Sequence, residues 1–333
     1  MARRFHSPRY SSREPVEIVS GKWLVKSIIA CLVAAGFALY CAVCLLFYQG
    51  QWQFVFSRNP PRHANAAAIA SSSGLPIQNI RFDYTEEGIA QLDGWWIPAE
   101  DETKLPASAQ GSAKTQPLVV LFCPNGRTTL PKNIDALRAF HSLGVSVFAF
   151  DYRGTGLSSS GHPSQEKAYA DGVAAFRYLT GIRHIAPNRI VLYGAEMGSA
   201  VAGSIVEQWP TIAGLVLENP QPSLTKQVRR EQHIHLLPMW LVFTENFDIS
   251  KITPTLKMPK LIIATSGKPE YFQGAEAVYN EAAPPKQKID INENRIQMLY
   301  NEQAWNRALQ QFLNRLDRNA SENNPSFTNK IEH

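Results

Sequence analysis

The sequence predicts an α/β protein: a mostly parallel central sheet with helices on both faces, preceded by one N-terminal transmembrane helix. Residues 27–48 form a long apolar run without a charged residue. Short apolar runs rich in β-branched residues follow downstream, and amphipathic segments of helical length separate them. The expected organisation is a cytoplasmic basic tail (1–26), a transmembrane helix (27–48), a connector (49–76), a folded domain (77–318) and a disordered tail (319–333).

The apolar run from Ser27 to Tyr48 reads SIIACLVAAGFALYCAVCLLFY. As a helix it would rise about 33 Å, which is enough to cross a hydrocarbon core of about 30 Å. A cleaved signal peptide would have a shorter apolar region, with small residues at a cleavage site directly after it. Here Gln-Gly-Gln-Trp follows instead. We therefore expect an uncleaved anchor, with the lipid bilayer as a partner through residues 27–48.

The charges around the apolar run predict its orientation. Arginine and lysine outnumber glutamate before the run: Arg3, Arg4, Arg9, Arg13, Lys22 and Lys26 stand against Glu14 and Glu17. Beyond the run, the nearest basic residues are Arg58 and Arg62. Basic residues stay on the cytoplasmic side of a membrane. We expect a cytoplasmic N-terminus and a main domain on the non-cytoplasmic side.

Charge and cysteine usage exclude several other classes of protein. A net charge of +5 without a basic stripe or a nucleic-acid-binding motif gives no reason to expect a nucleic-acid partner. Cys31, Cys41 and Cys44 lie in the apolar run, and Cys123 is alone downstream. No cysteine or histidine spacing is typical of a metal site, so we expect neither a metal nor a cofactor.

The region after the connector alternates predicted strands and helices. Residues 80–87 and 89–99 alternate apolar and polar side chains, which predicts an antiparallel pair of strands. The predicted parallel strands are PLVVLFCP, VSVFAFDY, RIVLYGA, GLVLENP, KLIIATSG and QKIDIN. The predicted helices include NIDALRAFHSLG, QEKAYADGVAAFRYLT, GSAVAGSIVEQW and EQAWNRALQQFLNRL. Each crossover is about one helix long, as right-handed β-α-β connections require.

One strand-to-helix junction carries a motif of catalytic type. Strand RIVLY runs into Gly194-Ala195-Glu196-Met197-Gly198, and a predicted helix follows at once. In the G-x-S-x-G motif of α/β-hydrolases, the glycines relieve crowding around a serine nucleophile on a sharp turn. Both glycines are present here, and glutamate holds the position of the serine.

Three segments resemble one family. Asp151-Tyr152-Arg153-Gly154-Thr155-Gly156-Leu157-Ser158, the strand GLVLENP (214–220) and the stretch LDGWWIPA (92–99) are similar to motifs of membrane-anchored α/β-hydrolases of the bud-emergence and abhydrolase-domain type, which are related to serine-aminopeptidase-like hydrolases. The likeness runs from about residue 47 to residue 316. It implies an α/β-hydrolase fold for the domain.

The resemblance also implies where a catalytic triad would lie, and each of those positions departs from the family. Glu196 replaces the serine, and Pro124-Asn125-Gly126 replaces the H-G-N oxyanion loop. The aspartate position falls within residues 264–269, which hold no aspartate. The histidine position falls within residues 293–296, and the sequence has no histidine between His235 and His333.

These losses predict a pseudohydrolase, a non-catalytic protein that binds a small molecule or a protein partner at the former active-site cleft. The alternative is a hydrolase of ester, lipid or peptide substrates with rearranged chemistry, in which Glu196 acts as a carboxylate nucleophile. A carboxylate at this place has a structural explanation too, because free amides at the start of a helix favour it. A third possibility is an ordinary lipid-ester or peptide hydrolase whose catalytic residues lie at other positions, and the lack of any late histidine argues against it. We expect His233 and His235 to have a surface or helix-packing role. We expect Glu270, near the position of the missing acid, to be a solvated loop carboxylate.

Overall fold

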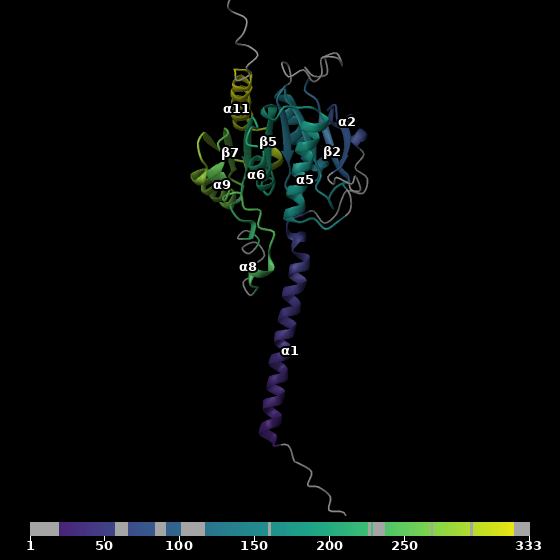
Figure 1. The fold of residues 1–333 in the computed structure, drawn as a ribbon, viewed down its shortest axis with the longest axis vertical. Coiled ribbons are helices and arrows are strands. Elements are labelled where there is room, and N and C mark those ends of the chain that lie inside the picture. The colour runs from purple at the N-terminus through teal and green to yellow at the C-terminus, as the bar shows by residue number, and fades with distance from the viewer. Residues whose placement is uncertain are drawn as a thin grey trace, which may run out of the picture. The chain divides into compact units, whose positions relative to one another are not determined.

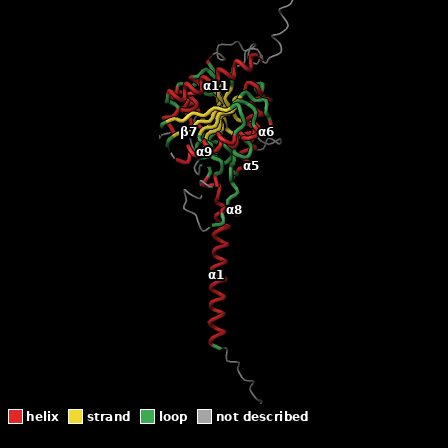
Figure 2. Tube along the Cα trace, turned by 90° about the vertical axis from the view of Figure 1, so that its left-hand side faces the viewer, coloured by secondary structure: helices red, strands yellow, loops and turns green. Residues whose placement is uncertain are grey.

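The computed structural model describes residues 20–56, 66–83, 91–100, 117–158, 161–225, 228, 237–267, 269–293 and 296–322. The chain divides into two compact units, Met1–Phe47 and Tyr48–His333. Figures 1 and 2 give two views of the chain, with the sheet of the second unit in its interior.

The first unit consists, in its described part, of helix α1. This helix runs from Gly21 to Gly50 and has no buried residue. By length and composition it is able to cross a membrane. It begins before the predicted span of residues 27–48 and includes that span entirely. Its last turn, from Tyr48 onward, belongs to the second unit.

The second unit is built on one eight-stranded sheet with the strand order β1-β2-β4-β3-β5-β6-β7-β8. The strands are β1 (Gln78–Asp83), β2 (Gln91–Ile97), β3 (Val119–Cys123), β4 (Ser146–Phe150), β5 (Ile190–Ala195), β6 (Gly214–Glu218), β7 (Lys260–Thr265) and β8 (Lys286–Ile291). β1 pairs antiparallel with β2, and β2 pairs antiparallel with β4. The other neighbours are parallel. The predicted α/β-hydrolase fold with a mostly parallel sheet is confirmed.

The burial of the strands follows their place in the sheet. Every residue of β3, β4, β5, β6 and β7 is buried, because helices cover both faces of the sheet there. The edge strands β1 and β8 are mostly exposed or half-buried. Uniformly apolar sequences such as VVLFC therefore mark the centre of the sheet, and mixed sequences such as KQKIDI mark its edges.

Helices pack on both faces of this sheet. The described helices of the second unit are α2 (Ala66–Ser73), α4 (Ile134–Ser142), α5 (Gln165–Arg177), α6 (Gly198–Gln208), α8 (Met239–Val242), α9 (Pro269–Glu281), α10 (Ile296–Leu299) and α11 (Gln303–Glu322). Leu137 and Phe140 of α4 share a core cluster with Trp305 and Leu309 of α11. α5 and α6 pack side by side on a face of the sheet (Figure 1).

The loop after β4 is held by buried polar contacts. The Asp171 carboxylate accepts hydrogen bonds from the backbone N–H of Arg153 (2.8 Å) and from its Nε (2.7 Å). Gly154 and Gly156 have φ values of +75° and +53°, and a Cβ on Gly156 would lie 1.7 Å from Oδ2 of Asp151. The D-Y-R-G-x-G motif is therefore a tight turn whose glycines are required by sterics.

Two predicted boundaries fall inside folded elements. Within the predicted connector of residues 49–76, Gln51, Val55, Phe56 and Leu75 are buried in the second unit. α11 continues to Glu322, so the first residues of the predicted disordered tail are helical. Residues 323–333 lie outside the described part of the chain.

Candidate functional site

The turn between β5 and α6 has the strained backbone that its motif predicts. Glu196 has a φ of +49°, in the left-handed region that non-glycine residues rarely adopt. Its N–H donates to the carbonyl oxygen of Glu218 (2.8 Å), and its own carbonyl oxygen accepts from the N–H of Ser199 (3.0 Å). These bonds hold the turn between the two elements. The Glu196 side chain is half-buried there.

The two glycines of the motif are required by close packing. A Cβ on Gly194 would lie 2.4 Å from Cα of Ser199. A Cβ on Gly198 would lie 2.1 Å from the carbonyl oxygen of Cys123 and 2.7 Å from that of Pro124. The start of α6 therefore presses against the end of β3 and the loop after it. This contact brings the turn next to the predicted oxyanion-loop position.

A pocket of about 190 Å³ adjoins this turn. Its lining residues come from the turn, from the loop after β3 and from four other segments: Phe54, Val55, Asn125, Arg127, Glu196, Met197, Gln221, Leu224, Phe247 and Tyr271. Of the predicted site residues, Glu196, Met197 and Asn125 are thus brought together. Gly194, Gly198, Pro124 and Gly126 do not line the pocket.

The loop Pro124-Asn125-Gly126 has a fixed shape. The Asn125 carbonyl oxygen accepts from the N–H and the Oγ1 of Thr128, both at 2.9 Å. The Asn125 Oδ1 accepts from the N–H of Arg127 (3.2 Å), and the Pro124 carbonyl oxygen accepts from the Tyr152 hydroxyl (3.1 Å). The side-chain oxygen of Asn125 is thus already engaged within its own loop.

The segment directly after α1 forms one wall of the pocket. The Phe54 carbonyl oxygen accepts from Nε (3.0 Å) and Nη2 (2.6 Å) of Arg127. A Cβ on Gly126 would lie 2.8 Å from the Val55 carbonyl oxygen. Phe56 is 1% exposed. Its ring centroid lies 6.0 Å from that of Tyr152 and 6.0 Å from that of Phe247. Sequence analysis missed this segment, although its apolar letters FVF (54–56) are a signal of burial.

A buried carboxyl group lies next to the turn, outside the pocket lining. Glu218, the last residue of β6, is 1% exposed and accepts hydrogen bonds from the hydroxyls of Tyr193 and Tyr300 (3.2 Å for Tyr300). Burial raises the pKa of Glu218 to about 7, and the nearby charge of Glu196 adds to the rise. Sequence analysis used this glutamate only as part of a strand motif. Its burial could not be predicted from that motif.

The positions where the family carries its acid and base are occupied by other groups. At the end of β7, the N–H and Oγ1 of Thr265 donate to Oδ1 of Asn219 (2.9 and 3.2 Å). The hydroxyl of Ser266 donates to Asn292 (2.9 Å). Glu270 is half-buried in the first turn of α9 and does not line the pocket.

Part of the histidine position, residues 294–295, lies outside the described residues, as do His233 and His235. Within the described ranges, no three His, Cys, Asp or Glu side chains gather as a metal site.

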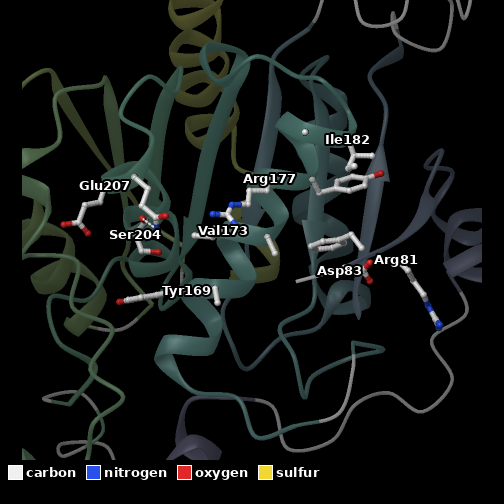
Figure 3. A pocket seen from close by; sticks show the side chains of 14 residues that line it. Arg81, Asp83, Tyr169, Val173, Arg177, Ile182, Ser204 and Glu207 are labelled. Atoms are coloured by element: carbon white, nitrogen blue, oxygen red, sulfur yellow. Dashed lines mark hydrogen bonds between the residues drawn. The ribbon is translucent and has the colours of Figure 1, made fainter. Parts of the chain in front are cut away.

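A second, larger groove of about 920 Å³ runs over α5 (Figure 3). Arg81 and Asp83 of β1 lie on one side of it, and Ser204 and Glu207 of α6 lie on the other. It shares no lining residue with the pocket at Glu196. Its size therefore says nothing about the chemistry of the turn.

Sequence comparisons identify relatives of the second unit. A family model described as serine aminopeptidase, S33, matches residues 119–291. An uncharacterized protein of Mycobacterium tuberculosis is 30% identical over 224 residues, which are 67% of this chain and 73% of that protein. The α/β hydrolase domain-containing protein WAV2 of Arabidopsis thaliana is 28% identical over 162 residues (46% of this chain, 48% of that protein). An uncharacterized membrane protein of Saccharomyces cerevisiae is 27% identical over 165 residues (49% and 52%).

Solved structures show the same fold. An esterase of Pyrococcus furiosus superposes with a TM-score of 0.57 at 20% identity, covering 78% of this chain and 97% of the esterase. An α/β hydrolase of Vibrio vulnificus gives a TM-score of 0.57 at 18% identity, covering 84% and 93%. With the family match over more than half of the sequence, the chain belongs to the serine aminopeptidase S33 family of α/β-hydrolase-fold proteins.

Proposed function

We propose that this chain is a membrane-anchored pseudohydrolase, which binds a small ligand or a protein partner at the former active-site pocket and does not hydrolyse it. The observation that carries the proposal is the residue on the turn between β5 and α6. Glu196 has the positive φ of a residue displayed on such a turn, and it lines the pocket. A nucleophilic serine would stand there in a hydrolase of this fold.

The absence of a general base supports the proposal. Ser-His-Asp chemistry needs an imidazole that takes a proton from the nucleophile and returns it to the leaving group. The sequence has no histidine between His235 and His333, and the described lining of the pocket includes none. A carboxylate nucleophile at Glu196 would still need a base to activate water for the second step.

The size of the pocket supports binding of a small ligand. Drug-sized ligands occupy pockets of about 300–1,000 Å³, and this pocket has about 190 Å³. Phe54 and Val55 form part of its wall, and Arg127 holds Phe54 in place by two hydrogen bonds. A long acyl chain or a peptide would have to displace this wall.

The apolar helix supports anchoring in a membrane. α1 is uncharged from Ser27 to Tyr48, and its side chains are mostly exposed. A relative in yeast is named a membrane protein. The basic residues before the helix favour a cytoplasmic N-terminus, which would put the second unit on the non-cytoplasmic side.

One observation favours a second candidate, a hydrolase that uses Glu196. Its carboxylate lies near Glu218, whose pKa is raised to about 7, and paired carboxyls with separated pKa values are typical of acid–base catalysis. Against this candidate, Glu218 is 1% exposed, is bound by two tyrosine hydroxyls and does not line the pocket.

The experiment is an activity measurement on the full-length chain in detergent micelles. We expect no labelling by a fluorophosphonate probe for serine hydrolases and no turnover of short-chain esters or aminopeptidase substrates. Turnover that disappears in both Glu196→Ala and Glu196→Gln would support the second candidate. Probe labelling of the unmodified chain would overturn both, because it requires an activated serine.

Glu196→Ser gives a sharper form of the same test, because it restores the residue type of the family on the existing turn. We expect this variant to stay inactive, since a serine without a base is not activated. Esterase activity in Glu196→Ser would mean that a base lies within reach, and Glu196→Ser combined with His233→Ala or His235→Ala would identify it.

A further inference from the structure

We propose that Trp240 and Leu241 of α8 insert into the lipid surface, so that the second unit touches the membrane at a point separate from its anchor. Trp240 is 83% exposed and Leu241 is 59% exposed. In the described part of the second unit, no other two adjacent large apolar residues are as exposed. This proposal rests on the membrane anchoring proposed above and adds the face of the domain that meets the bilayer.

Packing fixes the two side chains on the outside. Their neighbours Met239 and Val242 are each 4% exposed, and Phe243 is 3% exposed. The turn is closed by hydrogen bonds from the N–H groups of Leu241 and Val242 to the carbonyl oxygen of Pro238 (2.8 and 3.1 Å). The turn therefore buries Met239, Val242 and Phe243 and leaves Trp240 and Leu241 exposed.

Two hydrogen bonds tie the segment after α8 to Gln51. The Oε1 of Gln51 accepts from the N–H (2.7 Å) and the hydroxyl (3.3 Å) of Thr244. Gln51 directly follows the last residue of α1 and is 5% exposed. Three residues lie between Trp240 and Thr244, so their Cα atoms are at most about 14 Å apart. Trp240 is therefore held within about 14 Å of a residue that is hydrogen-bonded to Gln51, the first residue after α1.

The chemistry of the segment suits a bilayer rather than water. Residues 237–244 contain no charged side chain. Tryptophan is enriched where hydrocarbon meets lipid headgroups, because its ring is largely apolar and its indole N–H can still donate a hydrogen bond. α8 stands off from the body of the unit in both views, at the end opposite α11 (Figures 1 and 2).

The test uses the full-length chain in phosphatidylcholine vesicles whose acyl chains carry bromine, which quenches tryptophan fluorescence on contact. The chain has seven tryptophans, so the share of Trp240 is obtained by comparison with Trp240→Phe. We expect the fraction of quenched emission to fall in Trp240→Phe. The matched control is Trp209→Phe, at the C-terminal end of α6, which should leave the quenched fraction unchanged.

Flotation of the vesicles in alkaline carbonate separates this proposal from the anchoring on which it rests. If the chain floats and Trp240→Phe removes no quenching, the lipid contact is wrong and the anchor stands. If Trp240 is shielded from both the brominated lipid and aqueous acrylamide, the face binds a protein or a second copy of the chain, and the proposal is again overturned. If the chain does not float, the anchor fails and the lipid contact fails with it.

Discussion

Strained residues gather around the pocket. Among the described residues, the non-glycine residues with positive φ are His184, Glu196, Asn219 and Phe247. Glu196 and Phe247 line the pocket. Asn219 directly follows Glu218, whose carbonyl oxygen accepts a hydrogen bond from the Glu196 N–H. Such strain costs about 1–3 kcal/mol per residue and persists at sites that the surrounding structure holds in place. Glu196 thus holds the position of the motif's serine on a strained turn.

The strain at Glu196 predicts an unusual order of stabilities. With a φ of +49°, a residue with a Cβ costs about 1–2 kcal/mol that glycine avoids. We expect Glu196→Gly to be about 1 kcal/mol more stable than Glu196→Ala, measured by chemical denaturation. Ser204 lies inside α6 and supplies the control. There the free energy of unfolding should be about 1 kcal/mol higher for Ser204→Ala than for Ser204→Gly. The same order at both positions would contradict the strained turn.

The buried carboxyl of Glu218 predicts a pH dependence of stability. Its pKa is about 7 in the folded chain and about 4.5 in the unfolded chain. Between these values the folded state holds a proton that the unfolded state has lost. The contribution of Glu218 to the free energy of unfolding therefore falls by about 3 kcal/mol as the pH rises through this window, and it stays constant at higher pH.

Glu218→Gln should remove the part of this dependence that comes from Glu218, because the amide keeps an acceptor oxygen for Tyr193 and Tyr300 and does not ionise. The part that comes from Asp151, whose pKa burial also raises to about 7, should remain. We expect the variant to gain stability relative to the unmodified chain between pH 5 and pH 8. Glu276→Gln is the control, because the pKa of Glu276 is lowered by its hydrogen bond to Lys288 and it stays ionised over this range. An equal gain in both variants would rule out Glu218 as the cause.

At the scale of elements, the sequence predicted the sheet and its helices well because their periodicity is local. Fully apolar strands such as RIVLY and amphipathic segments such as that of α5 can be recognised from their own residues, without knowledge of what packs against them. The placement of residues 54–56 depends on contacts with Arg127, Tyr152 and Phe247, which lie far away along the chain. No local pattern carries that information. For the same reason, the sequence placed Glu196 on its turn and did not reveal Glu218 beside it.

The segment after α1 should behave as part of the core. Phe56 is 1% exposed, so Phe56→Ala should lower the free energy of unfolding by about 3–5 kcal/mol. Phe272, which is 44% exposed and has Lys288 4.5 Å from its ring centroid, is the control, and Phe272→Ala should cost about 1 kcal/mol or less. Equal costs in a denaturation experiment would mean that residues 51–56 do not hold the domain together.

At the scale of the whole molecule, the charge bias around the apolar helix predicts a topology. With a cytoplasmic N-terminus, protease added to sealed spheroplasts should digest the domain from residue 59 onward and spare residues 1–26. Epitope tags at the two ends of the chain would report each part, and lysed spheroplasts provide the control in which both are digested. Protection of the large domain would show the opposite orientation.

The burial of Val55 and Phe56 also limits how the domain can be released from the proposed anchor. A protease that cut after Phe56 would leave that ring behind and uncover Tyr152 and Phe247, against which it packs. The Phe54 and Val55 wall of the pocket would leave with it. A released form that keeps both its stability and its pocket must therefore be cut before Gln51, within the last turn of α1. Cleavage at any later site should release a domain that has lost its function.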